Sequence, residues 1–79
     1  GGKVKVWPTP SSSSINIDFG MTVNTILGIF DLSGRLIQQT AINNEKSVII
    51  STENIDNGIY MLRVIDNDIN FTQKIVIKK

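Results

Sequence analysis

Hydrophobic and polar residues alternate along most of this chain, and turn-forming residues interrupt the alternation at short intervals. The stretch at residues 14–19 shows the pattern best, because Ile15, Ile17 and Phe19 fall on one face of an extended chain. No segment keeps the period of an amphipathic helix. The pattern predicts seven short strands, over residues 4–7, 14–19, 25–31, 35–42, 47–51, 59–66 and 69–78. Such strands are typical of an immunoglobulin-like antiparallel β-sandwich, and we expect that all-β fold.

The best-defined turn lies between the third and fourth predicted strands, at Ser33 and Gly34. Glycine accepts the positive φ that tight hairpin turns need, so we expect Gly34 and the following Arg35 to have a structural role. The Asp-Asn-Asp stretch at residues 66–68 separates the last two strands. It offers few ligands for Ca²⁺, which takes about six to eight oxygens, so we interpret it as a turn.

The length of 79 residues leaves room for one domain, and we assign residues 1–79 to a single folded unit. Hydrophobic residues make up 41% of the chain, which suits a packed domain and argues against disorder. The absence of cysteine excludes disulfides and thiolate metal sites. The net charge of +1 gives no reason to expect nucleic acid or an anionic membrane as a partner, and no apolar run is long enough to insert into a membrane as a helix.

Residues suited to catalysis are scarce. The chain has neither histidine nor cysteine, the usual general base and the thiol nucleophile. A carboxylate pair is the remaining acid–base device, but the acidic residues stand mostly at turns or strand ends, and only Asp18 lies within a clean alternating stretch. No sequence motif for phosphate, nucleotide or zinc binding is present. We therefore expect no enzymatic activity, no cofactor and no metal.

The stretch Ile-Asp-Asn-Gly-Ile-Tyr at residues 55–60 is more specific. An apolar residue, a turn, a glycine and a tyrosine at the start of a strand are typical of the tyrosine corner of sandwich domains, in which the phenol bonds an upstream backbone group. We expect Tyr60 to pin such a corner; contact with a ligand is the alternative. Trp7 stands beside Pro8 and is expected to pack at a sheet edge.

The predicted strand over residues 59–66 is apolar on both faces. Tyr60, Leu62 and Val64 share one parity and are expected to face the core. The opposite face would carry an exposed apolar patch that consists of Ile59, Met61 and Ile65. Outward-facing lysines of the last strand would border this patch. Exposed patches of this kind often mark partner sites, and coverage by a neighbouring loop or domain is the equally open alternative.

Four motifs follow one another along the chain: Val-Trp-Pro-Thr-Pro at 6–10, Asp-Leu-Ser-Gly-Arg at 31–35, Ile-Asp-Asn-Gly-Ile-Tyr at 55–60 and Lys-Ile-Val-Ile-Lys-Lys at 74–79. Together they cover nearly the whole chain, which resembles the C-terminal sorting domain of the type IX (Por) secretion system in its type A form. Trp7 and Thr9 stand where the family usually has Tyr and Asn, and Ile55 replaces the common Leu. The glycines, Tyr60 and the terminal strand agree well.

The resemblance implies a non-catalytic signal with an immunoglobulin-like fold, fused to an upstream cargo protein. In this family an outer-membrane translocon reads the signal and a sortase-like peptidase usually removes it. The cargo of a Gram-negative bacterium thus passes through the periplasm to the cell surface or the medium. The cut would lie before or near Lys3, and Gly1 and Gly2 have the composition of an expression scar. The positions that match the family's recurring ones, and are expected to be recognised, are Gly58, Tyr60, Lys74, Ile75, Val76, Ile77, Lys78 and Lys79.

A second interpretation rests on the fold class alone, which does not settle function. It is an immunoglobulin-like or fibronectin-like module for adhesion or carbohydrate binding in a secreted protein. Tight binding of the isolated domain to a glycan array would favour this second interpretation. For the terminal lysines the sequence leaves two roles open: direct contact with the secretion machinery, or solvation of the last strand.

Overall fold

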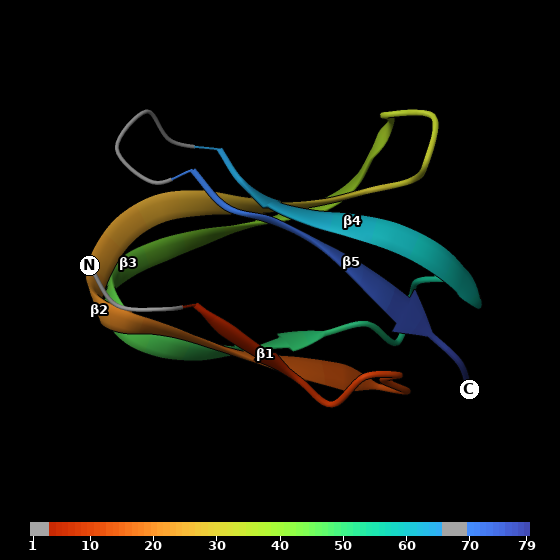
Figure 1. Cartoon of the computed structure of the whole chain (residues 1–79), viewed down its shortest axis with the longest axis horizontal. Coiled ribbons are helices and arrows are strands. Elements are labelled where there is room, and N and C mark those ends of the chain that lie inside the picture. The colour runs from red at the N-terminus through yellow and green to blue at the C-terminus, as the bar shows by residue number, and fades with distance from the viewer. Residues whose placement is uncertain (1–3, 66–69) are drawn as a thin grey trace.

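The computed structural model describes residues 4–65 and 70–79. Within these ranges it contains five β-strands and no helix, which confirms the all-β class (Figure 1). The strands are β1 (Lys5–Trp7), β2 (Ser14–Phe30), β3 (Leu36–Ser51), β4 (Gly58–Val64) and β5 (Thr72–Ile77). No helix among the described residues is suited to crossing a membrane. The turn predicted at residues 66–68 lies outside the described residues.

All five strands belong to one antiparallel sheet, with β2 at its centre. β3 pairs with β2 on both sides of a bend. On the other edge of β2, β1 pairs with the first half, where Val6 lies opposite Ile17. β4 pairs with the second half, where Leu62 lies opposite Ile29, and β5 pairs with β4. The two halves of β2 therefore carry different neighbours on the same edge.

Two of the predicted turns are bends inside longer strands, so the prediction of about seven strands is wrong. At the first bend, Gly20 has a φ of 75° and its N–H donates a hydrogen bond of 2.8 Å to the Asp18 carboxylate. At the second, Asn44 has a φ of 56° and its N–H donates to the Asn24 side-chain oxygen at 2.8 Å. The β2–β3 register shifts between Asp18 and Val23 and again between Val23 and Asn24, and the two strands go on pairing to Phe30 with one more shift before that residue. The chain bends sharply here without leaving the sheet, as at a β-bulge.

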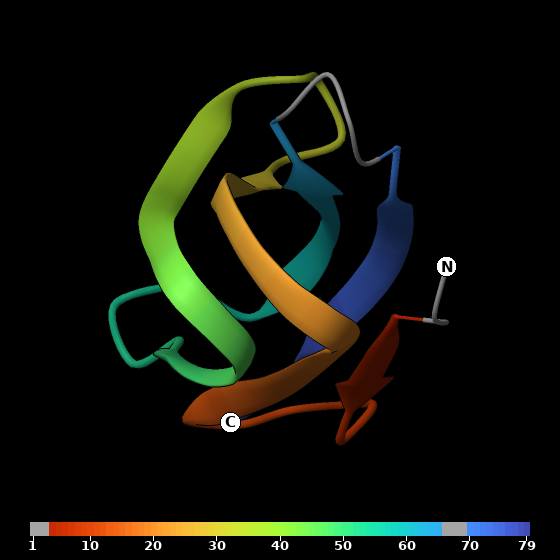
Figure 2. The same ribbon diagram turned by 90° about the vertical axis from the view of Figure 1, so that its left-hand side faces the viewer.

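These bends curl the sheet into a half-barrel (Figures 1 and 2). One wall consists of β1 with the adjoining halves of β2 and β3, and the other contains β4 and β5. The expected sandwich has two separate sheets, whereas here one sheet continues through both walls. The difference arises because the long β2 and β3 strands run through the bends and belong to both walls.

The interior of the half-barrel is filled by aliphatic side chains and two rings. Within β2 the inward parity is the same before and after the bend, since Ile17 and Ile29 are both buried. Each fully buried side chain of this size contributes about 1.5–3 kcal/mol to the free energy of unfolding. The buried apolar residues are Ile15, Ile17, Phe19, Val23, Leu27, Ile29, Ile42, Ile50, Ile55, Tyr60, Leu62, Val64, Ile75 and Ile77.

Candidate functional site

Three segments that are distant in the sequence meet beside the C-terminal end of β5: residues 11–13, the corner at residues 52–58, and residues 76–79. We call them together the terminal cluster. Ser11 links the first segment to the last. Its N–H donates to the Val76 carbonyl oxygen at 2.9 Å, and its own carbonyl oxygen accepts from the Lys78 N–H at 2.8 Å. Ser11 is buried by this contact, which forms a parallel bridge on the outer edge of β5.

Thr52 links the first segment to the corner. Its N–H donates to the Ser13 carbonyl oxygen at 2.8 Å, and its hydroxyl donates to the Ser12 carbonyl oxygen at 3.2 Å. Its own carbonyl oxygen accepts from the Ile55 N–H at 3.1 Å, which begins the corner. A buried hydroxyl costs free energy unless it is hydrogen-bonded, so these bonds explain how the fully buried Thr52 is accommodated.

The corner itself is held by Tyr60. The phenol hydroxyl donates a hydrogen bond of 2.8 Å to the Asp56 carbonyl oxygen, four residues upstream. This is the geometry of a tyrosine corner, with the ring packed into the core. Gly58 lies against the same ring, because a Cβ there would stand 3.4 Å from its Cε2 atom. The structure therefore places Gly58 and Tyr60 together in the backbone framework of the terminal cluster.

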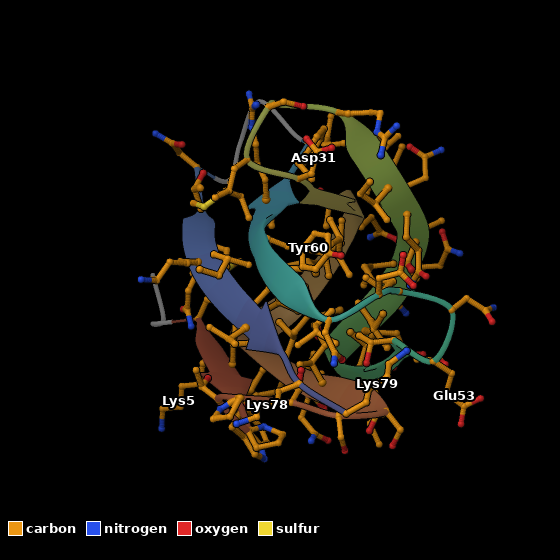
Figure 3. All side chains as sticks on the ribbon, turned by 90° about the vertical axis from the view of Figure 1, so that its right-hand side faces the viewer. Lys5, Asp31, Glu53, Tyr60, Lys78 and Lys79 are labelled. Atoms are coloured by element: carbon orange, nitrogen blue, oxygen red, sulfur yellow. The ribbon has the colours of Figure 1, made fainter. Side chains whose placement is uncertain are left out.

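Lys79 also bonds the corner, through both its backbone and its side chain. Its backbone N–H donates to the Asn57 side-chain oxygen at 2.9 Å, and its ammonium group donates to the Glu53 carbonyl oxygen at 2.6 Å (Figure 3). Lys74 and Lys78 differ from it, since both are exposed and neither forms a salt bridge with another of the described residues. Ile75 and Ile77 are buried in the core. The terminal stretch thus combines two core residues, one tethered lysine and two unpaired ammonium groups.

The outer face of β4 and β5 is apolar at its centre and basic at its border. Ile59 is 46% exposed and lies opposite Val76, and Met61 lies opposite Lys74. The Arg63 guanidinium lies over a partly buried Phe30 ring on β2, at 5.9 Å from the ring centroid. The structure places all three residues of the expected patch on the outward parity, Ile59 and Met61 in β4 and Ile65 just beyond it. We call this surface, formed by Phe30, Ile59, Met61, Ile65 and Val76, the outer patch.

The turn at Gly34 is stabilised by one carboxylate. Gly34 has a φ of 93°, and Asp31 accepts hydrogen bonds from the Ser33 hydroxyl at 2.6 Å and from the Arg35 N–H at 2.9 Å. The Ser33 hydroxyl, then the Arg35 N–H, hold the pKa of Asp31 below its ordinary value because both bonds favour the charged form. The other Asp31 oxygen lies 3.2 Å from Arg35 Nε. Gly34 and Arg35 therefore lie in a self-contained turn.

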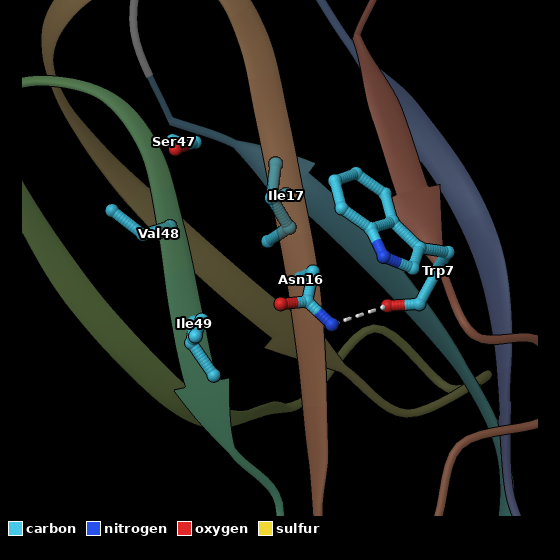
Figure 4. A pocket seen from close by; sticks show the side chains of 6 residues that line it. All are labelled: Trp7, Asn16, Ile17, Ser47, Val48 and Ile49. Atoms are coloured by element: carbon cyan, nitrogen blue, oxygen red, sulfur yellow. Dashed lines mark hydrogen bonds between the residues drawn. The ribbon is translucent and has the colours of Figure 1, made fainter.

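A shallow hollow lies on the outer face of the opposite wall (Figure 4). Trp7, Asn16 and Ile49 form a row across three strands, with Trp7 46% and Ile49 73% exposed. The Asn16 side-chain amide donates to the Trp7 carbonyl oxygen at 3.3 Å. Trp7 lies at the sheet edge, as expected, but its ring is half exposed and borders the hollow.

A model of the family described as secretion system C-terminal sorting domain matches residues 5–78 of the chain. The chain belongs to this family. It is a type IX secretion sorting domain, and the resemblance seen in its four motifs is confirmed. The family is generally non-catalytic, and it implies association with the type IX secretion machinery and with a cargo protein that is exported. A search of the curated proteins found no match.

Sequence reasoning missed two residues that hold the sorting domain's terminal cluster together. Ser11 and Thr52 are small polar residues in segments expected to be turns or connections, yet both are almost fully buried. Their bonds reach across 65 and 40 residues of sequence. Local alternation carries no signal for such contacts; a serine directly after Pro10 and a threonine just before the corner were the visible hints.

Proposed function

We propose that this sorting domain directs an upstream cargo protein from the periplasm across the outer membrane of a Gram-negative bacterium. The outer-membrane translocon binds the folded domain, and a sortase-like peptidase then removes it near Lys3. The cargo stays on the cell surface or enters the medium. A domain of this kind acts by being bound, so its function lies in the shape and charge of its surface.

The terminal cluster is the observation that supports this proposal. Residues 76–79 are bound by the corner that contains Gly58 and Tyr60, and by Ser11 next to the Pro-Thr-Pro stretch. Two of the four motifs of the family thus meet at one end of the molecule, together with the residue that follows a third. A receptor that binds there reads a folded surface, because the short motif at 74–79 has its two isoleucines in the core.

We further propose that the machinery contacts the outer patch together with Lys74 and Lys78. The patch exposes apolar area, and exposed apolar area bordered by charge is typical of partner sites. The strands β4 and β5 carry Arg63 and Lys74, and neither contains an acidic residue. The surface is therefore suited to a partner that combines apolar side chains with carboxylates.

Replacing Lys74 and Lys78 together by alanine tests this contact. Both side chains are exposed, so the free energy of unfolding should change by no more than about 0.5 kcal/mol. Surface delivery of a cargo fusion should nevertheless fall, because two charges at the recognised surface are lost. Lys46→Ala is the matched control, since Lys46 is an exposed lysine on the distant β3 strand. Normal delivery of the double variant would show that these lysines only solvate the strand.

The second candidate, a carbohydrate-binding module, has one specific observation in its favour, the half-exposed Trp7 ring beside the hollow. An aromatic ring of this kind can support a sugar by stacking. A glycan array with the isolated domain separates the two functions: we expect no tight sugar binding, and saturable binding that Trp7→Ala abolishes would favour the second candidate.

A further inference from the structure

The outer edge of β5 has backbone groups that no described strand uses. Val64 N–H donates to the Phe71 carbonyl oxygen at 3.1 Å, and the register pairs Leu62 with Gln73 and Tyr60 with Ile75. Hydrogen-bonded and non-bonded pairs alternate along an antiparallel ladder. The odd-numbered residues of β5 therefore direct their N–H and C=O groups at β4. The backbone groups of the even-numbered residues of β5, at positions 72, 74 and 76, therefore point away from β4.

Only the last part of this edge is occupied within the described ranges 4–65 and 70–79. Ser11 pairs with the Val76 carbonyl oxygen and the Lys78 N–H, and no other described residue bonds the edge. The segment before Ser11 contains Pro8 and Pro10, which have no N–H to donate, and it leads back to β1, which pairs with β2. Among the described residues, none pairs with the backbone groups of Thr72 and Lys74 on this edge.

The other two sheet edges are less suited to accept a strand. β1 is three residues long. The free edge of β3 bends at Asn44, and the Gln38 side-chain amide donates to the Ser51 carbonyl oxygen at 2.9 Å. β5 is a regular strand, and its unpaired edge adjoins the outer patch. The Lys74 side chain lies on the same face of the sheet as that patch.

We propose that an extended, carboxylate-bearing segment of a partner protein adds to β5 as a new edge strand alongside residues 72–75, the part of the edge that Ser11 does not occupy. Its backbone would pair with Thr72 and Lys74, as in other cases of strand addition. Its carboxylates would lie beside Lys74 and Lys78, and its apolar side chains would extend the outer patch. An acidic partner fits this surface because β4 and β5 contain basic residues and no acidic ones. The inference deepens the proposed function, on which it rests, by stating how the machinery binds.

Proline substitutions on the edge test the backbone contact. Thr72→Pro and Lys74→Pro each remove an N–H that points away from β4, so the β4–β5 ladder is kept, whereas the partner strand loses a donor. Each is compared with alanine at the same position, which removes the side chain but keeps the N–H. Each proline variant should deliver about tenfold less cargo fusion to the surface than its alanine counterpart, since a lost hydrogen bond and a clash together weaken binding by that order.

Thermal unfolding and crosslinking in cells distinguish a lost partner contact from a misfolded domain. Thermal unfolding of the purified variants should show both prolines folded, and Gln73→Pro, whose N–H faces β4, should be the unstable one. A photoreactive amino acid in place of Thr72 should crosslink in living cells to an acidic extended segment of a secretion component. Crosslinks to a second copy of this chain, or delivery of folded Thr72→Pro equal to that of Thr72→Ala, would overturn the inference. The proposed function would still stand if the unmodified domain exports its cargo.

Discussion

Deletion of residues 74–79 from a cargo fusion is expected to abolish delivery of the cargo across the outer membrane. The deletion removes most of β5, including Ile75 and Ile77, which are 2% and 1% exposed in the core. It also removes every bond that residues 76–79 make with Ser11 and with the corner. Protease treatment of intact cells measures the result, because only cargo on the surface is digested.

The deletion has to be distinguished from loss of the cargo itself. Recovery of folded, active cargo from the periplasm of the same cells provides that control. The double replacement of Lys74 and Lys78 by alanine provides a second one, because it leaves β5 and the core in place. Normal surface delivery of the deleted fusion would contradict the account, since neither the terminal cluster nor the edge of β5 would then be needed.

Leu62→Ala is expected to destabilise the domain strongly. Leu62 is fully buried, and replacing a buried leucine by alanine typically costs about 2–5 kcal/mol, part of it for the cavity left behind. Small domains have only about 5–15 kcal/mol of stability, so a large share of the free energy of unfolding would be lost. Urea unfolding of the purified domain, followed by tryptophan fluorescence, measures the cost.

Ile59→Ala is the matched control, since Ile59 lies on the same strand but is 46% exposed. It should cost well under half as much as Leu62→Ala, because part of its apolar area already contacts water. Equal costs for the two variants would contradict the assignment of Ile59 to an open surface. The same pair also separates folding from recognition, because Ile59→Ala should reduce export while leaving the domain folded.

The alternation of the sequence was enough to predict which side chains of β4 face the core. Tyr60, Leu62 and Val64 were expected to face inward, and all three are buried. Strict period-two alternation fixes the face of each residue once a strand is assigned, whatever its neighbours are. The corner at Tyr60 was equally predictable, because its hydrogen bond spans only four residues.

The number of strands could not be predicted in the same way. Gly20 and the stretch around Asn44 look like chain reversals, since residues that accept a positive φ serve tight turns and bulges alike. The outcome depends on whether β2 and β3 go on pairing past the bend, which is a contact between distant segments. The terminal cluster was hidden for the same reason, since Ser11 and Val76 are 65 residues apart in the sequence.

The central claim is that the folded domain by itself carries the address for type IX export. The most direct measurement fuses residues 3–79 to a reporter protein that has an inner-membrane export signal, in two strains of a bacterium that differ only in a functional type IX translocon. Protease accessibility of the reporter on intact cells is the readout. We predict surface reporter in the strain with the translocon and periplasmic reporter in the strain without it. Reporter that stays in the periplasm of both strains, although the fused domain is folded, would contradict the account.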